Sequence, residues 1–341
     1  MKKVVIGMSG GVDSSVAAIL LQKQGYEVIG VTFIFTDNFD VSEAQEVCKK
    51  LNIKHYIKDY RKEFKEEIIN KFLDDYKSGL TPNPCVLCNK KIKIKYLIDA
   101  MKEFNADFIA TGHYARVIDG KLYKSENINK DQTYFLSQLS KEEISKLIFP
   151  LDNMDKGEVR TIASEYGLTN ASKKDSYDVC FITSSFKEYM QNYLKPNKGS
   201  IINIKTNEEI GIHDGLMYYT IGQRKGLNLG GNKDRLFVIN KDLDNNILYV
   251  ASDSDGYLYS SEAEIENVNW ISDERPEVCN AKFRYRQTEQ PVNIKYLENG
   301  NIILNYSNEV KSVTPGQVCA LYKDDECLGG GIIKSFKNNN I

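Results

Sequence analysis

The chain has 341 residues, of which 41% are hydrophobic and 27% charged, and its formal net charge is -2. This length suits two or three domains of about 100–200 residues each. The near-neutral charge excludes a basic nucleic-acid packaging protein, so any RNA must be bound by local patches. The sequence has no stretch of eighteen apolar residues and no charged-then-apolar leader, so we expect an untargeted, cytoplasmic protein.

Strands and helices are predicted to alternate along the first part of the chain. Apolar runs predict strands and amphipathic runs predict helices, and such alternation indicates an α/β fold with a doubly wound parallel sheet whose loops gather at one edge. The predicted strands cover residues 2–8, 27–35, 54–58 and 107–111, and the predicted helices cover 16–24, 41–51, 62–77 and 91–104.

After about residue 196 the pattern changes to short alternating runs separated by Asn, Asp and Gly, a spacing typical of β-hairpins. We therefore predict an α/β domain over residues 1–196 followed by two smaller strand-rich domains, over residues 197–262 and 263–341. The runs that carry this prediction are 236–240, 246–251, 292–297 and 301–306.

A glycine- and serine-rich turn joins the first predicted strand to the first helix, with the sequence Ser9-Gly10-Gly11-Val12-Asp13-Ser14-Ser15. Free backbone N–H groups and hydroxyls at a helix N-terminus bind anions, and glycine lets the backbone approach a phosphate closely. Asp13 is expected to help hold Mg²⁺ or to cap the helix. The lysine of the usual triphosphate-binding loop is missing, which favours pyrophosphate as a leaving group and therefore AMP transfer. An ordinary tight turn capped by Ser14 is the alternative.

Three of the seven cysteines stand in a context that suggests chemistry. Cys85 and Cys88 form a CxxC that we predict on a loop just before a lysine-rich helix, and Cys180 follows a pair of lysines. Cations and a helix N-terminus lower the pKa of a thiol and make the thiolate available. The other four, Cys48, Cys279, Cys319 and Cys327, are expected to be buried thiols.

The turn resembles the PP-loop of N-type ATP pyrophosphatases, and the whole chain resembles the tRNA-specific 2-thiouridylase (MnmA) family. That resemblance implies an adenine nucleotide alpha hydrolase-like PP-loop domain followed by two small strand-rich modules, the last a β-barrel. The motifs that carry it are Gly7-Met8-Ser9-Gly10-Gly11-Val12-Asp13-Ser14, Asn83-Pro84 with Cys88-Asn89, residues 111–116 and 130–136, Lys174-Asp175-Ser176, Cys180-Phe181-Ile182, and residues 213–216, 220–227, 284–287 and 314–317.

The resemblance implies an activity. ATP would adenylate the 2-carbonyl of the wobble uridine in tRNAs for Lys, Glu and Gln, and sulfur from a cysteine persulfide would displace AMP. Cys180 would carry the persulfide, and Cys88 would attack it or form the resolving disulfide. A cysteine desulfurase or a sulfur relay protein would donate the sulfur.

The resemblance also assigns binding residues. Phe33 stands where the family commonly has Met or Leu, a change that a main-chain contact would tolerate, and His113 is expected to order its loop and not to act as a base. The implied ATP residues are Gly7, Met8, Ser9, Gly10, Gly11, Val12, Asp13, Ser14, Phe33 and Gly112. The implied target-base residues are Asn83, Pro84 and Cys85, and the implied tRNA-body residues are Lys130, Asp131, Gln132, Arg284 and Tyr285.

Cys85 differs from the pattern of the family, whose well-known members have Asp at this position. Cys85, Cys88 and Cys180 could hold three irons of a [4Fe-4S] cluster whose fourth iron carries the transferred sulfide, and zinc ranks lower for want of a fourth ligand. We rank the persulfide slightly ahead of the cluster. A non-thiolating PP-loop synthetase, which would need no cysteine pair, and a nucleotide- or tRNA-binding module without chemistry are the alternatives of another class.

Overall fold

The structure is a computed structural model that describes residues 1–173, 179–230 and 235–338. Lys174, Asp175 and Ser176 of the predicted motif lie outside the described residues. Within the described ranges, no helix combines the length and the apolar character needed to cross a bilayer.

A five-stranded parallel sheet forms the N-terminal part, with the strand order β3-β2-β1-β4-β7. Side chains alternate between its two faces: Val4 and Ile6 pack on the side of α1, and Val5 packs on the side of α6. Helices cover both faces, which explains the nearly continuous apolar runs in β1 and β2. The strands are β1 (Lys3–Gly7), β2 (Glu27–Ile34), β3 (Lys54–Asp59), β4 (Phe108–Ala110) and β7 (Leu147–Ile148), and the helices against one face are α1 (Val12–Lys23), α2 (Ser42–Lys50) and α8 (Lys156–Glu165).

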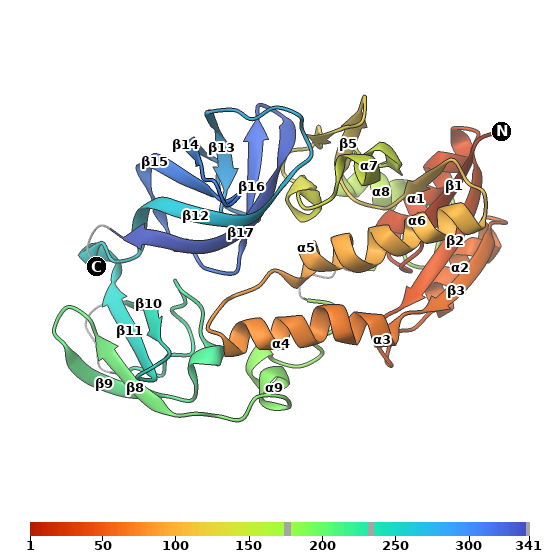
Figure 1. Cartoon of the computed structure of the whole chain (residues 1–341). Coiled ribbons are helices and arrows are strands. Elements are labelled where there is room, and N and C mark those ends of the chain that lie inside the picture. Colours follow the sequence, from red (N-terminus) through yellow and green to blue (C-terminus); the bar gives the residue numbers. More distant parts are fainter. Residues whose placement is uncertain (174–178, 231–234, 339–341) are drawn as a thin grey trace.

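Two long helical arms extend from the sheet and run side by side toward the strand-rich modules (Figure 1). One arm joins α3 (Arg61–Phe64), the π-helical segment η1 (Lys65–Ile69) and α4 (Asn70–Lys77), and the other joins α5 (Pro84–Cys88), η2 (Asn89–Lys93) and α6 (Ile94–Glu103). The second arm begins earlier than predicted, because Asn83 caps it by accepting a hydrogen bond from the Val86 N–H at 3.3 Å and proline occupies its first turn. The loop position predicted for the CxxC is therefore wrong, and both cysteines lie in the helix.

The central module is a four-stranded sheet in the order β10-β11-β8-β9, and it packs near the end of α4 (Figure 1). Its core belongs to the same cluster as Phe64, Phe72 and Cys88, so this module and the helical arm share one hydrophobic core. Its strands are β8 (Gly199–Asn203), β9 (Glu208–His213), β10 (Leu236–Asp242) and β11 (Ile247–Ser252). The shorter helices are η3 (Thr133–Leu136), α7 (Lys141–Ser145), α9 (Phe186–Gln191), η4 (Leu216–Tyr218) and η5 (Asp253–Asp255).

The C-terminal strands close into an antiparallel barrel, because β12 pairs with both β15 and β17. The barrel is attached to the N-terminal part through β6, whose Tyr123 pairs with Glu326 of β17. The predicted α/β domain followed by strand-rich modules and a final barrel is therefore confirmed. The barrel strands are β12 (Tyr259–Trp270), β13 (Val278–Lys282), β14 (Gln290–Tyr296), β15 (Ile302–Lys311), β16 (Val318–Lys323) and β17 (Glu326–Asn338), and the attached hairpin is β5 (Ala115–Ile118) and β6 (Lys121–Lys124).

Candidate active site

The predicted phosphate loop connects β1 to α1, and its own side chains hold it in shape. Ser14 Oγ donates to the Gly11 carbonyl at 3.0 Å and accepts from the Ser9 N–H at 3.3 Å. Gly10 adopts a φ of +78°, a conformation that favours glycine. A Cβ at Gly112 would lie only 2.8 Å from the Ser14 nitrogen, so the turn after β4 packs directly on this loop.

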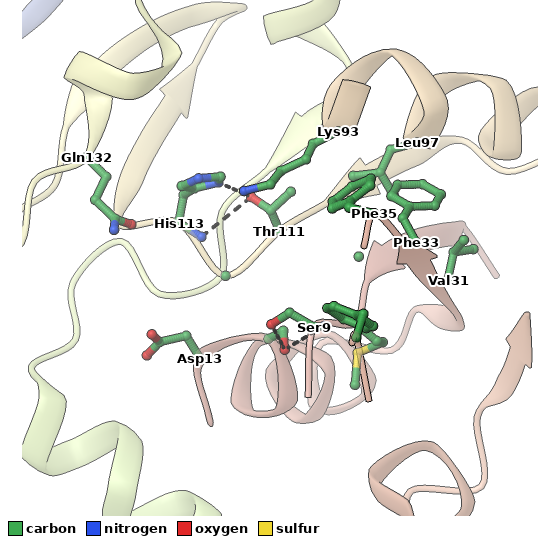
Figure 2. A pocket seen from close by; sticks show the side chains of 15 residues that line it. Ser9, Asp13, Val31, Phe33, Phe35, Lys93, Leu97, Thr111, His113 and Gln132 are labelled. Atoms are coloured by element: carbon green, nitrogen blue, oxygen red, sulfur yellow. Dashed lines mark hydrogen bonds between the residues drawn. The ribbon is translucent and has the colours of Figure 1, made fainter. Parts of the chain in front are cut away.

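A cavity of about 260 Å³ opens above the loop (Figure 2). Val31, Phe33 and Phe35 give it an apolar wall, whereas Ser9 and Asp13 give it a polar end. An apolar wall for a base beside an anion-binding loop is the arrangement that a nucleotide requires. Of the predicted ATP residues, the cavity is lined by Gly7, Met8, Ser9, Asp13, Ser14, Phe33 and Gly112; Gly10, Gly11 and Val12 complete the loop behind it.

Asp13 is held from two sides. Lys156 Nζ lies 2.8 Å from both carboxylate oxygens, and Tyr114 Oη donates to Oδ1 at 2.8 Å. Asp13 does not cap α1, because Gly11 occupies the N-cap position. A carboxylate oxygen is a suitable Mg²⁺ ligand when phosphate oxygens supply others, so Asp13 fits that part of the prediction.

Cys85, Cys88 and Cys180 gather around one lysine that the sequence analysis passed over. The positive charge of Lys93 lowers the pKa of all three thiols. Cys180 in turn raises the pKa of Cys85 and of Cys88. Cys88 is buried, whereas Cys180 is exposed at the surface. The convergence of the CxxC with Cys180 is thus a property of the folded chain.

The prediction that the surroundings of Cys88 lower its pKa is wrong. Burial raises the pKa of Cys88 to about 12, and Lys93 offsets only part of this effect. Burial also raises the pKa of Cys85 and Cys180, since the protein that surrounds the exposed Cys180 on its other sides still desolvates the thiol. Desolvation disfavours the thiolate and here exceeds the effect of the nearby cation. Cys48, Cys279, Cys319 and Cys327 are buried, as predicted.

The three thiols do not form a metal site in this structure. Over residues 1–173, 179–230 and 235–338, no three His, Cys, Asp or Glu side chains are placed to hold a metal ion. The donor set predicted for a [4Fe-4S] cluster or zinc is present by residue type, but its geometry does not fit.

Phe181 anchors the segment that carries Cys180. Its ring lies 5.7 Å from Phe64, 5.3 Å from Phe72 and 5.7 Å from Tyr189, centroid to centroid. Phe64 in turn stacks at 5.0 Å on Phe35, a wall of the cavity. A continuous aromatic chain thus connects the cavity to the residue next to Cys180.

His113 orders its turn, as expected, since its Nδ1 lies 2.8 Å from Thr111 Oγ1. Burial lowers the pKa of His113 to about 3, so the ring is neutral near pH 7. Asn170 is another residue that the sequence analysis missed: its Nδ2 donates to the Gly10 carbonyl at 2.8 Å. Neither Asn170 nor Lys156 is close in sequence to the loop that it supports, so no local pattern could reveal them.

The residues predicted to contact the tRNA body have clear structural partners. Asp131 is buried and accepts a hydrogen bond from Thr133 Oγ1 at 2.8 Å, and Gln132 lines the cavity and accepts from the Tyr114 N–H at 3.0 Å. Arg284 Nη2 donates to the Ile221 carbonyl at 2.9 Å. Tyr285 lies 4.3 Å from Phe135, ring centroid to centroid. Contacts of Lys130, Asp131, Gln132, Arg284 and Tyr285 with RNA remain predictions.

The chain matches three family models. Residues 2–184 match the tRNA methyl transferase HUP domain, residues 187–252 the tRNA methyl transferase PRC-barrel domain, and residues 260–333 the aminomethyltransferase beta-barrel domain. Among solved structures, a 4-thiouridine synthetase–RNA complex with bound ATP is 22% identical with a TM-score of 0.40, covering 53% of this chain and 45% of that chain.

Relatives with curated names align along nearly the whole chain. The tRNA-specific 2-thiouridylase MnmA of Geobacillus thermodenitrificans is 44% identical, over 99% of this chain and 96% of the relative. The protein of the same name from Bacillus cytotoxicus is 45% identical, over 97% of this chain and 94% of the relative. With this identity over its full length, and with the PP-loop and the cysteines in one place, the chain belongs to the tRNA-specific 2-thiouridylase (MnmA) family.

Proposed function

We propose that the protein is an ATP-dependent tRNA 2-thiouridylase that acts on the wobble uridine of tRNAs for Lys, Glu and Gln in the cytoplasm. One observation carries this proposal: Lys93 lines the cavity of the PP-loop and also interacts electrostatically with Cys85, Cys88 and Cys180. Nucleotide activation and sulfur transfer can therefore occur at adjoining places. The names of the aligned relatives support the same reaction.

The first step is adenylation. The uridine 2-carbonyl oxygen attacks the α-phosphorus of ATP, the bond from that phosphorus to pyrophosphate breaks, and pyrophosphate leaves. The backbone N–H groups of the loop and Ser9 would bind the phosphates. Asp13 would hold Mg²⁺, which supplies charge neutralisation when it is bound. Asn83, Pro84 and Cys85 would lie beside the base.

The second step replaces oxygen by sulfur. The terminal sulfur of a Cys180 persulfide attacks C2, the C–O bond breaks, and AMP leaves with the former uridine oxygen. The Cys88 thiolate then attacks the Cys180 sulfur, which breaks the S–S bond to the transferred sulfur, leaves 2-thiouridine and forms a Cys88–Cys180 disulfide. A thiol reductant returns both cysteines to thiols. A cysteine desulfurase or a sulfur relay protein would load the exposed Cys180.

The three-part organisation is part of this proposal: a catalytic domain over residues 1–196, a central domain over 197–262 and a barrel over 263–341 that positions tRNA. Lys130, Asp131, Gln132, Arg284 and Tyr285 would contribute to that positioning. The alternative carrier, a sulfide bound to an iron–sulfur cluster, does not fit the arrangement of the three thiols among the described residues. An assay of iron and acid-labile sulfide in anaerobically purified protein tests this, and the persulfide proposal predicts neither in stoichiometric amount.

The test is to incubate unmodified tRNA with the protein, MgATP and a sulfur source, and to measure 2-thiouridine by nucleoside mass spectrometry. We expect thiolation by the wild type and by the control Cys279→Ser, and none by Cys88→Ser or Cys180→Ser. 2-Thiouridine formed by the Cys88→Ser, Cys180→Ser double variant would contradict the cysteine relay. Pyrophosphate release without any 2-thiouridine in the wild type would instead indicate a non-thiolating PP-loop synthetase.

A further inference from the structure

The PP-loop end of the cavity, where the phosphates of a nucleotide would bind, offers little positive charge. Residues 7–15 of the loop contain no lysine or arginine, and their one charged side chain is the anionic Asp13. Lys156 lies nearby, but its ammonium bridges both oxygens of Asp13 at 2.8 Å. Loop and Lys156 together therefore offer little net charge to a triphosphate of about four negative charges.

Lys93 enters the same cavity from another element. It belongs to η2 and reaches in from the wall opposite Ser9, with its ammonium directed toward Thr111 and His113 (Figure 2). Within the described residues, its ammonium makes no hydrogen bond and no ion pair with a carboxylate. His113 cannot serve as a second cation, because its pKa of about 3 keeps it neutral.

No anionic side chain of the described residues balances the charge of Lys93. Desolvation lowers its pKa, whereas Cys88, Cys180 and Cys85 raise it when they are thiolates. Burial raises the pKa of these three thiols, so at neutral pH they are protonated and supply no counter-charge to the ammonium of Lys93. A partly buried cation without a carboxylate partner is costly unless a ligand supplies the counter-charge.

We propose that Lys93 is the phosphate-binding cation of this enzyme: its ammonium binds non-bridging phosphate oxygens of ATP and replaces the lysine that the PP-loop lacks. An ammonium between the loop and the thiols would stabilise the charge that develops on the phosphates as pyrophosphate leaves. The inference rests on the proposed use of ATP and adds a residue to that reaction.

The test compares ligands with and without phosphates, in the absence of tRNA and sulfur donor. Calorimetry measures the binding of MgATP and of adenosine to the full-length wild type, Lys93→Met, Lys93→Arg and the control Lys91→Met, whose side chain is exposed on the same helix. We expect Lys93→Met to bind MgATP about 10- to 100-fold more weakly, the loss typical of a hydrogen bond to a charged group, and to bind adenosine within about twofold of the wild type. Lys93→Arg should retain part of the MgATP affinity, and Lys91→Met all of it.

Equal affinity of Lys93→Met and wild type for MgATP would overturn the inference. So would a parallel loss for adenosine, because it would mean that the cavity had collapsed. A wild type that binds no MgATP at all would instead contradict the proposed function. Since no thiolation is measured, a failure of sulfur transfer leaves this test unaffected.

Discussion

At the scale of single residues, burial determines the charge state of the groups around the site. All three thiols have raised pKa values although Lys93 lies beside them, because desolvation exceeds the effect of one cation. Cys88 must therefore lose its proton against an unfavourable equilibrium. The positive charge of Lys93 stabilises the Cys88 thiolate once it has formed.

Burial also predicts a pH dependence of stability. The chain has three histidines, and desolvation is the largest cause that lowers the pKa of each, to about 3 for His113. The unfolded chain binds protons on these residues below about pH 6.5, whereas the folded chain binds them only at lower pH. The contribution of these histidines to the free energy of unfolding is therefore fully present above about pH 6.5. It should decrease on acidification, by at most about 1.4 kcal/mol per pH unit for each histidine.

Denaturant unfolding at pH 7.0 and pH 5.5 measures this effect. His113→Asn should show a smaller decrease between the two pH values than the wild type. Equal or greater stability of the wild type at pH 5.5 would contradict the burial of neutral histidines.

At the scale of elements, the site depends on where helices begin and on what their side chains pack against. The strands, the helices and the PP-loop could be predicted from apolar periodicity and glycine placement. The helix predicted to begin at Lys91 begins seven residues earlier, at Pro84. Apolar periodicity gave no sign of this start, because it depends on Asn83 as the cap and on Pro84 in the first turn. The gathering of Cys180 with the CxxC could be predicted only from the family resemblance, since aromatic packing around Phe181 brings it there.

Phe181→Ala tests this packing. Removing a ring held by Phe64, Phe72 and Tyr189 should lower the free energy of unfolding by about 3–5 kcal/mol. It should also change the rate at which iodoacetamide alkylates Cys180 and reduce thiolation more than MgATP binding. Phe283→Ala, which removes a fully buried ring of the barrel core, is the matched control. It should lose comparable stability with no change in Cys180 alkylation, and an identical alkylation rate in Phe181→Ala would refute the anchoring role.

At the scale of the whole molecule, polar contacts join the three parts around the site. Thr81, on the link between the helical arms, donates its N–H to the Pro315 carbonyl at 2.9 Å, and Gln317 Nε2 donates to the Thr81 carbonyl at 2.7 Å. Arg284 bonds to Ile221 of the central region and to Thr314. The sequence predicted the number of modules, but these contacts join residues far apart in the chain and follow only from the fold.

Substitution of Arg284 and of Arg286, the two arginines of the motif at residues 284–287, should therefore have different effects on stability. Arg286 is exposed, so Arg286→Ala should weaken tRNA binding and reduce the slope of log affinity against log salt concentration by about 0.9, the effect of one phosphate contact. Arg284→Ala should in addition lower the melting temperature, because it removes the bonds to Ile221 and Thr314. MgATP binding should persist in both variants. An unchanged salt slope in Arg286→Ala would show that its charge does not contact tRNA.

The central claim is that ATP converts the uridine 2-oxygen into a leaving group that sulfur replaces. The most direct measurement uses tRNA labelled with ¹⁸O at the 2-carbonyl of the wobble uridine, with MgATP and a sulfur source, followed by mass spectrometry of AMP. The account predicts one ¹⁸O atom in the phosphate of each AMP formed with 2-thiouridine. Unlabelled AMP together with thiolated tRNA would contradict it, because the oxygen would then have left by another route.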